Sequence, residues 1–166
     1  TVTVVYNSWS GTNDHRSPLL GSPNLNQHEF NLTVKIQRFC PDKISMFELP
    51  LLSSARDIHD RMSGVEGAFD RMTLAVADLK AVGQRVVGVF VETKLNLHTW
   101  RETAELGFAL GLDGMMFNRF NPGGRGSQNL EVLQPSPAEI QQALDVADRI
   151  SIECDFPVHC SIAMPP

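Results

Sequence analysis

Apolar residues recur from about residue 44 onward in two patterns that alternate along the chain. Short runs rich in apolar and β-branched residues have the length and composition of buried strands. They occupy residues 44–49, 86–91, 115–120 and 158–162. Between them, apolar residues spaced by three and four predict amphipathic helices, of which the clearest covers residues 68–82 and is capped by Gly83. A shorter helix is expected at residues 54–62.

Two capping boxes predict where two further helices begin. In this motif a hydroxyl and a carboxylate three residues later satisfy two free N–H groups at the helix start. Thr99 with Glu102 fits the motif, and so does Ser136 with Glu139. Pro137 strengthens the second case because proline is favoured at the first helical position.

Strands that are each followed by a helix predict βα units, joined by right-handed crossovers into one parallel sheet. We therefore expect an α/β fold over residues 44–166, either a doubly wound sheet or an arc of a (β/α) barrel. Residues 1–43 are irregular, with a β-like run at 2–6 and a loosely alternating stretch at 30–39 that is a second possible strand.

Composition narrows the class of protein. The 166 residues include 42% hydrophobic residues, enough for one folded domain, and the net charge of −5 comes without a basic run. A nucleic acid is therefore not expected as the main partner. The chain has no apolar run of membrane-spanning length and no signal-like start, and its three cysteines are sparse, so we expect a cytoplasmic location without membrane contact. Because the sequence opens at Thr1, we expect a piece of something longer.

Polar residues cluster where the predicted strands end. Ligands of parallel α/β sheets bind at the carboxyl ends of the strands, so these positions are the candidates for chemistry. They are Glu48, Ser53 and Ser54 after the first strand, Glu92, Thr93, Lys94 and Asn96 after the second, and Asn118, Arg119 and the 121–126 loop after the third.

Several of these residues admit two interpretations. Lys94 can form a Schiff base if it is desolvated, or it can be a solvated lysine paired with Glu92 or Glu102. The pair His59 and Asp60 suits acid-base chemistry, although the following arginine is more typical of a surface helix.

The glycine loop and the cysteines also admit two interpretations each. The 123–126 loop can present backbone N–H groups to an anion, with Arg119 and Arg125 as partners, or it can be a simple turn. Cys154 and Cys160 are candidate metal ligands, but their spacing is not that of zinc sites, and buried thiols are the alternative.

Three segments, taken in order, resemble the radical S-adenosylmethionine (radical SAM) superfamily, in particular its SPASM-type peptide and protein maturases. They are IHDRMSGVEGAFDR at residues 58–71, VFVETKLN at 89–96 and FNRFNPGGRG at 117–126. The resemblance covers roughly residues 44–162 and corresponds to the C-terminal half of that family's barrel. It implies a partial (β/α) barrel, S-adenosylmethionine and a four-iron four-sulfur cluster as cofactors, and radical modification of a peptide, protein or cofactor precursor.

The same resemblance implies which residues bind the cofactor, but it assigns no catalytic residue. The 93–96 segment would face the ribose and methionyl part, and Asn118, Arg119 and the glycine loop would lie beside the adenosyl group or the substrate. The full set of implied cofactor-binding residues is Glu48, Thr93, Asn96, Asn118, Arg119, Gly123 and Gly124.

The chain also departs from the family. It lacks the CxxxCxxC motif that holds the cluster and the GGEP strand end, and Pro50 stands where many relatives have serine. We therefore do not expect this chain to generate the radical unaided; a missing N-terminal half or self-association would be needed. One alternative is a non-catalytic barrel remnant or binding module, and another is a barrel lyase or aldolase that uses Lys94.

Overall fold

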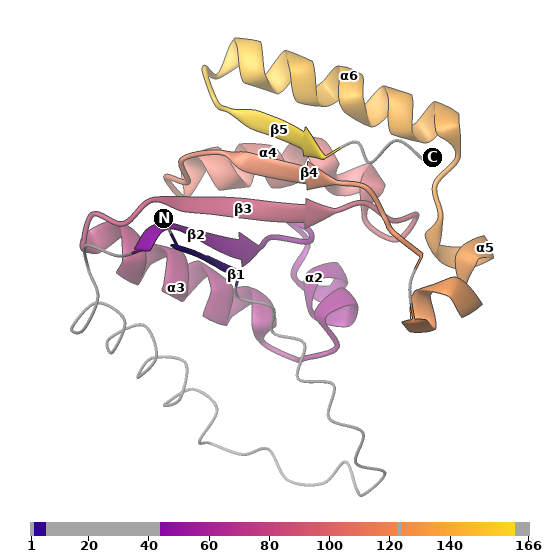
Figure 1. The fold of residues 1–166 in the computed structure, drawn as a ribbon, viewed down its shortest axis with the longest axis horizontal. Coiled ribbons are helices and arrows are strands. Elements are labelled where there is room, and N and C mark those ends of the chain that lie inside the picture. The colour runs from indigo at the N-terminus through magenta and orange to yellow at the C-terminus, as the bar shows by residue number, and fades with distance from the viewer. Residues whose placement is uncertain (1, 6–43, 123, 162–166) are drawn as a thin grey trace, which may run out of the picture.

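The computed structural model describes residues 2–5, 44–122 and 124–161, which form one parallel sheet with helices packed on it (Figure 1). Five strands lie in the order in which they occur along the chain, and every neighbouring pair is parallel. They are β1 (Val2–Val5), β2 (Ile44–Pro50), β3 (Val86–Val91), β4 (Met115–Asn118) and β5 (Val158–Ser161).

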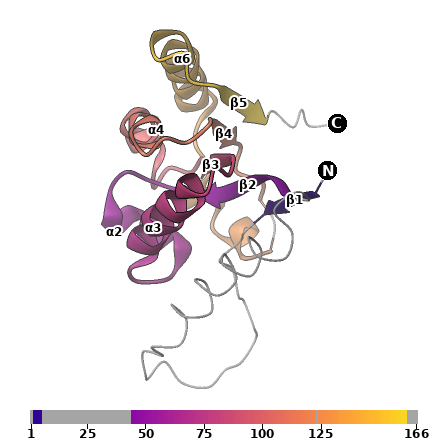
Figure 2. The same ribbon diagram turned by 90° about the vertical axis from the view of Figure 1, so that its left-hand side faces the viewer.

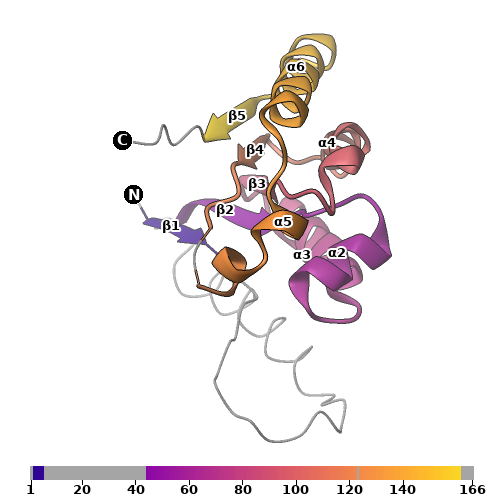
Figure 3. The same cartoon turned by 90° about the vertical axis from the view of Figure 1, so that its right-hand side faces the viewer.

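The longer helices cover one face of this sheet, as the two side views show (Figure 2 and Figure 3), and the short helix at residues 130–133 lies at the carboxyl ends of the strands. A doubly wound sheet reverses its strand order and carries helices on both faces. A barrel keeps its strands in the order of the sequence and carries its helices on the outer face only. The described residues therefore form an arc of a (β/α) barrel, which decides between the two predicted architectures. The helices are α2 (Arg56–Ser63), α3 (Ala68–Ala81), α4 (Trp100–Ala109), α5 (Leu130–Leu133) and α6 (Pro137–Glu153), with 3-10 turns η1 (Leu97–Thr99) and η2 (Gly124–Gln128).

The core lies between the sheet and the helices. Three aromatic rings at its centre, Phe90, Trp100 and Phe117, are almost fully buried, with ring centroids 4.8 to 5.8 Å apart. The Trp100 indole donates a hydrogen bond of 3.1 Å to the Ala143 carbonyl, which joins α4 to α6. Rings of this size contribute the largest apolar area per residue, so this cluster fixes both helices against β3 and β4.

Most predicted elements are confirmed, with three corrections. The third predicted strand ends at Asn118 instead of residue 120, and the end of the glycine loop forms η2. The Ser136 capping box is present, but the one at Thr99 is wrong, because the Thr99 hydroxyl bonds elsewhere in the core. The possible strand at 30–39 lies outside the described residues.

Candidate functional site

The carboxyl ends of the strands form one edge of the sheet, to which the predicted site residues were assigned. The strand arrows in Figure 1 point toward this edge, and α2 and α5 lie beside it. Glu48 is the exception among the candidates. It lies inside β2 opposite Val87, four residues below the level at which Asn118 pairs with Val91. Because a strand rises about 3.3 Å per residue, Glu48 lies roughly 13 Å below the level of Asn118.

The residues that follow β3 form a closed, self-bonded turn. The Asn96 Oδ1 atom accepts the Thr93 N–H at 2.8 Å and the Thr93 hydroxyl at 2.9 Å. The Asn96 Nδ2 atom donates to the Leu52 carbonyl at 2.7 Å and to the Val91 carbonyl at 3.0 Å. Both ends of the Asn96 amide are therefore occupied by the chain itself, and the side chain is fully buried.

Three further hydroxyls extend this turn into a buried cluster, which we call the polar junction: Ser53, Thr93, Asn96, Thr99 and Thr103. Thr99 shares a 2.9 Å hydrogen bond with Ser53 and donates to the Asn96 carbonyl at 2.8 Å. Thr103 donates to the Thr99 carbonyl and accepts the Ser54 N–H at 2.8 Å. The polar junction thus joins the loop after β2 to the start of α4.

His59 extends these contacts into α2. It is buried, with 1% of its surface exposed, whereas the other residues of α2 are half-buried or exposed, as the surface-helix interpretation predicts. Its Nδ1 atom accepts the Leu52 N–H at 3.2 Å, which requires a neutral ring with the proton on Nε2. Burial lowers the pKa of His59, and the neighbouring Asp60 offsets only part of that effect. A neutral, enclosed imidazole holds a loop here and does not face solvent for acid-base chemistry.

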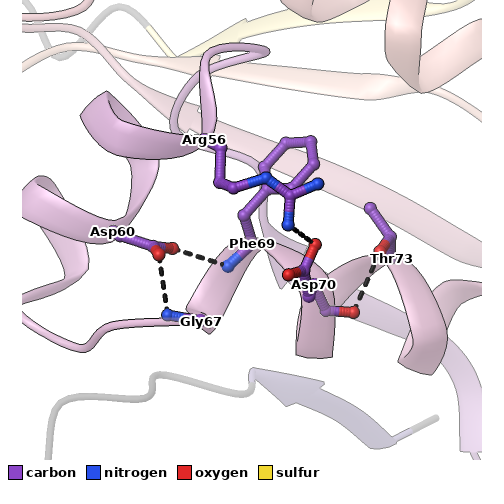
Figure 4. A network of polar contacts seen from close by, with 6 residues as sticks. All are labelled: Arg56, Asp60, Gly67, Phe69, Asp70 and Thr73. Carbon is purple, nitrogen blue, oxygen red and sulfur yellow. Dashed lines mark hydrogen bonds and ion pairs between the residues drawn. The ribbon is translucent and has the colours of Figure 1, made fainter.

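Asp60, which lies in α2, caps the start of the next helix, α3 (Figure 4). Its two carboxylate oxygens accept the Gly67 N–H at 2.7 Å and the Phe69 N–H at 2.8 Å, at the start of that helix. Partial burial raises the pKa of Asp60, but these N–H groups outweigh it and leave that pKa below its usual value. Arg56 completes the region with an ion pair to Asp70 and a guanidinium 5.3 Å above the Phe69 ring. The 58–71 motif therefore builds a helix junction.

Two buried acceptor atoms at the carboxyl edge have no hydrogen-bond partner among the described residues: Glu92 Oε2 and Asn118 Oδ1. The side chain of Glu92 is 2% exposed, and its Oε1 lies 4.0 Å from Arg119 Nε. Burial raises the pKa of Glu92. The Arg119 guanidinium and the Phe120 N–H lower that pKa, but they do not cancel the effect of burial, because the ion pair is long and Arg119 is partly exposed. An acceptor without a donor is costly in a folded chain, so both atoms are suited to a ligand that brings N–H or O–H groups.

Asn118 and Arg119 are consecutive and face different sides of the sheet. Asn118 pairs in register with Val91, and that row of residues faces away from the helices. Arg119 lines a depression of 220 Å³ on the helix side, together with Phe117 and the α6 residue Ile140. A single ligand on the open face of the sheet would therefore meet the side chain of Asn118 before that of Arg119.

Lys94 is exposed and holds the connection between β4 and α6. Its Nζ donates to the Glu131 carbonyl at 2.8 Å, and its backbone N–H donates to the Leu133 carbonyl at 2.9 Å. The expected pairing with Glu92 or Glu102 is replaced by this contact with α5. The desolvation that a Schiff-base lysine requires is absent at an exposed position.

The described cysteines do not form a metal centre. Cys154 caps the end of α6 and Cys160 lies on β5, and both are free thiols. No group of three potential ligands of the His, Cys, Asp or Glu type occurs within residues 2–5, 44–122 and 124–161. Cys40 and Gly123 lie outside these ranges, and Gly124 opens η2. The described residues therefore do not fit a four-iron four-sulfur cluster, which needs three thiolates, because they include only two cysteines.

Sequence reasoning named Ser53, Thr93 and Asn96 but missed the rest of the polar junction. The spacing of Asn96, Thr99 and Thr103, at i, i+3 and i+7, places three short polar side chains on one helical face, and that spacing was the available signal. A search for helices able to cross a membrane finds none in the described part of the chain.

The strand order and the one-sided helices define this fold as part of a (β/α) barrel. Comparisons with protein-family profiles and with curated proteins give no match. Three crystal structures of SuiB from Streptococcus suis do match, each over 96% of this chain: one of SuiB (TM-score 0.64, 13% identity), one bound to S-adenosylmethionine (0.63, 12%) and one bound to the precursor peptide SuiA (0.66, 13%).

The chain spans about a third of the length of SuiB, with 31 to 32% of that protein covered. At this identity the likeness establishes the fold. The partial barrel predicted from the ordered motifs is therefore confirmed.

Proposed function

We propose that this chain forms the S-adenosylmethionine-binding wall of a radical SAM-type enzyme that modifies a peptide, protein or cofactor precursor. The observation that carries the proposal is the fold shared with SuiB, which has been crystallised with S-adenosylmethionine and with a precursor peptide. The three family-like segments of the sequence support it, because two of them end at the carboxyl edge of the sheet.

The residues at this edge fit S-adenosylmethionine. Its ribose hydroxyls and its amino groups are hydrogen-bond donors, and the open face of the edge offers the unpartnered acceptor Asn118 Oδ1. In this proposal Asn118 binds a hydroxyl or amino group on the open face of the sheet, and the apolar neighbours Val89 and Val91 exclude water beneath it. When bound together with a reduced iron-sulfur cluster, S-adenosylmethionine supplies a 5′-deoxyadenosyl radical; the described residues supply the cofactor's binding surface and no ligands for the cluster.

The experiment is a calorimetric titration of the full chain with S-adenosylmethionine. We expect saturable binding that weakens about tenfold or more in Asn118→Leu, because one hydrogen bond to a partly buried ligand contributes about 1 to 2 kcal/mol. Gln142→Leu is the matched control, since it replaces an exposed amide on the outer side of α6.

Absence of binding to the wild-type chain would contradict the proposal. Equal affinities for Asn118→Leu and Gln142→Leu would remove Asn118 from the site.

A further inference from the structure

We propose that Asn96 is a positioning residue, which fixes the loop after β2 against the end of β3 through its fully bonded amide and does not itself touch a ligand. This assignment differs from the role that the family resemblance implies for the 93–96 segment. It concerns the same carboxyl edge of the sheet as the proposed function, and it depends on that function only for the experiment that adds a ligand.

The first argument is saturation of the Asn96 side chain. An asparagine amide has two N–H donors and one oxygen with two lone pairs. Asn96 donates to Leu52 and Val91 and accepts twice from Thr93, at distances between 2.7 and 3.0 Å. A ligand could bond to this amide only by displacing one of the four contacts, and the buried partner left behind would lose its hydrogen bond.

The second argument is where these contacts lead. Leu52 is 44 residues from Asn96 in the sequence, and it is also the residue whose N–H donates to His59. Leu52 is therefore held at its carbonyl by Asn96, in the turn after β3, and at its N–H by His59 of α2. The neighbouring Ser53 is fixed to Thr99 by a 2.9 Å hydrogen bond. The loop that follows β2 is thus held by contacts from the turn after β3, from α2 and from η1, which order this part of the edge before any ligand arrives.

The third argument is the contrast with Asn118. Both residues are asparagines at the carboxyl edge of neighbouring strands, but Asn118 Oδ1 has no partner among the described residues, whereas Asn96 has four contacts. The structure thus separates the two amides into one that supports the edge and one that is available to a ligand.

The test replaces Asn96 by aspartate, which keeps the shape and the acceptor oxygen but removes both donors. Above its pKa the buried carboxylate would face the Leu52 and Val91 carbonyl oxygens, so the Asn96→Asp chain should unfold at a urea concentration lower by about 1 M or more at pH 8. When the carboxyl is protonated it regains one O–H donor. Because the folded state would then bind the proton more tightly than the unfolded state, the gap to wild type should narrow as the pH falls to about 5.

Two controls keep this result specific. His98→Ala removes an exposed side chain two residues along the same turn and should leave the urea midpoint close to wild type at every pH. Thr93→Val removes one hydroxyl donor without adding charge, and should lower stability by a pH-independent amount. If Asn96→Asp does not fold at pH 8, recovery of the folded state near pH 5 gives the same answer.

A ligand readout separates this inference from the proposed function. In the wild-type chain the Asn96 side-chain NH2 resonances should exchange slowly with solvent and keep their positions when S-adenosylmethionine is added. An Asn96→Asp gap that is constant with pH, or NH2 resonances that exchange rapidly or show direct contacts with the added ligand, would overturn the inference. If S-adenosylmethionine does not bind at all, the proposed function fails, and the pH test still decides the role of Asn96.

Discussion

His59 shows how a single side chain makes the fold sensitive to pH. Its Nδ1 atom accepts a hydrogen bond that an imidazolium cannot accept, and burial lowers its pKa from the ordinary value of about 6.5. The unfolded chain therefore binds a proton at a higher pH than the folded chain does. The contribution of His59 to stability is present above pH 6.5 and is lost as the pH falls from there through the folded-state pKa.

We predict that urea midpoints of the wild-type chain fall as the pH is lowered below about 6.5, and that His59→Gln has a shallower pH dependence. Glutamine retains an acceptor for the Leu52 N–H but does not titrate. Chemical denaturation followed by tryptophan fluorescence at a series of pH values measures this. Parallel curves for the two proteins would show that His59 does not control the acid sensitivity.

Single polar residues also show what the sequence could not reveal. Asn96 and Thr93 were identifiable as polar residues after a strand, but the Leu52 carbonyl that Asn96 binds lies 44 residues away and carries no sequence signal. The Thr99 capping box has the right residue types, yet the hydroxyl bonds to Ser53 and Asn96 because those partners are nearer once the loops pack. Tertiary contacts therefore decided the roles of polar residues that local patterns had only located.

At the scale of elements, apolar periodicity was sufficient for most of the fold. The strands β2 and β3 and the helix α3 begin and end within two residues of the predicted positions, because each has one consistently apolar face. The third strand was predicted two residues too long, since the run was extended to the apolar Phe120, whereas the ladder with β3 ends where Asn118 pairs with Val91. The strand order was not readable from periodicity, because both candidate architectures use the same βα units.

Helix α5 depends on Lys94 for its position beside the edge. None of its residues is buried, and it contacts the loop after β3 through the two hydrogen bonds of Lys94. We predict that Lys94→Met increases amide hydrogen exchange over residues 130–134 several-fold while changing the free energy of unfolding by less than about 1 kcal/mol, since an exposed hydrogen bond contributes little.

Lys94→Arg, which retains a donor at the same place, is the matched control and should exchange as the wild type does. Exchange mass spectrometry resolves this segment. Unaltered protection in Lys94→Met would mean that other contacts hold α5.

At the scale of the whole molecule, the arc leaves its two end strands, β1 and β5, each with a single partner among the described residues. β5 pairs with β4 only, and three of its four residues are exposed. Exposed strand edges promote pairing with another chain. We predict concentration-dependent self-association, measured by light scattering after size-exclusion chromatography. A monomer at high concentration would contradict this.

The central claim is that S-adenosylmethionine binds at the carboxyl edge of the barrel arc. Hydrogen-exchange mass spectrometry of the full chain with and without S-adenosylmethionine tests it directly. We predict added protection in peptides that cover residues 91–99 and 117–122, with no change over 82–86 and 111–114 at the opposite edge of the sheet. Protection that appears only at the opposite edge, or no protection at saturating ligand, would contradict the account.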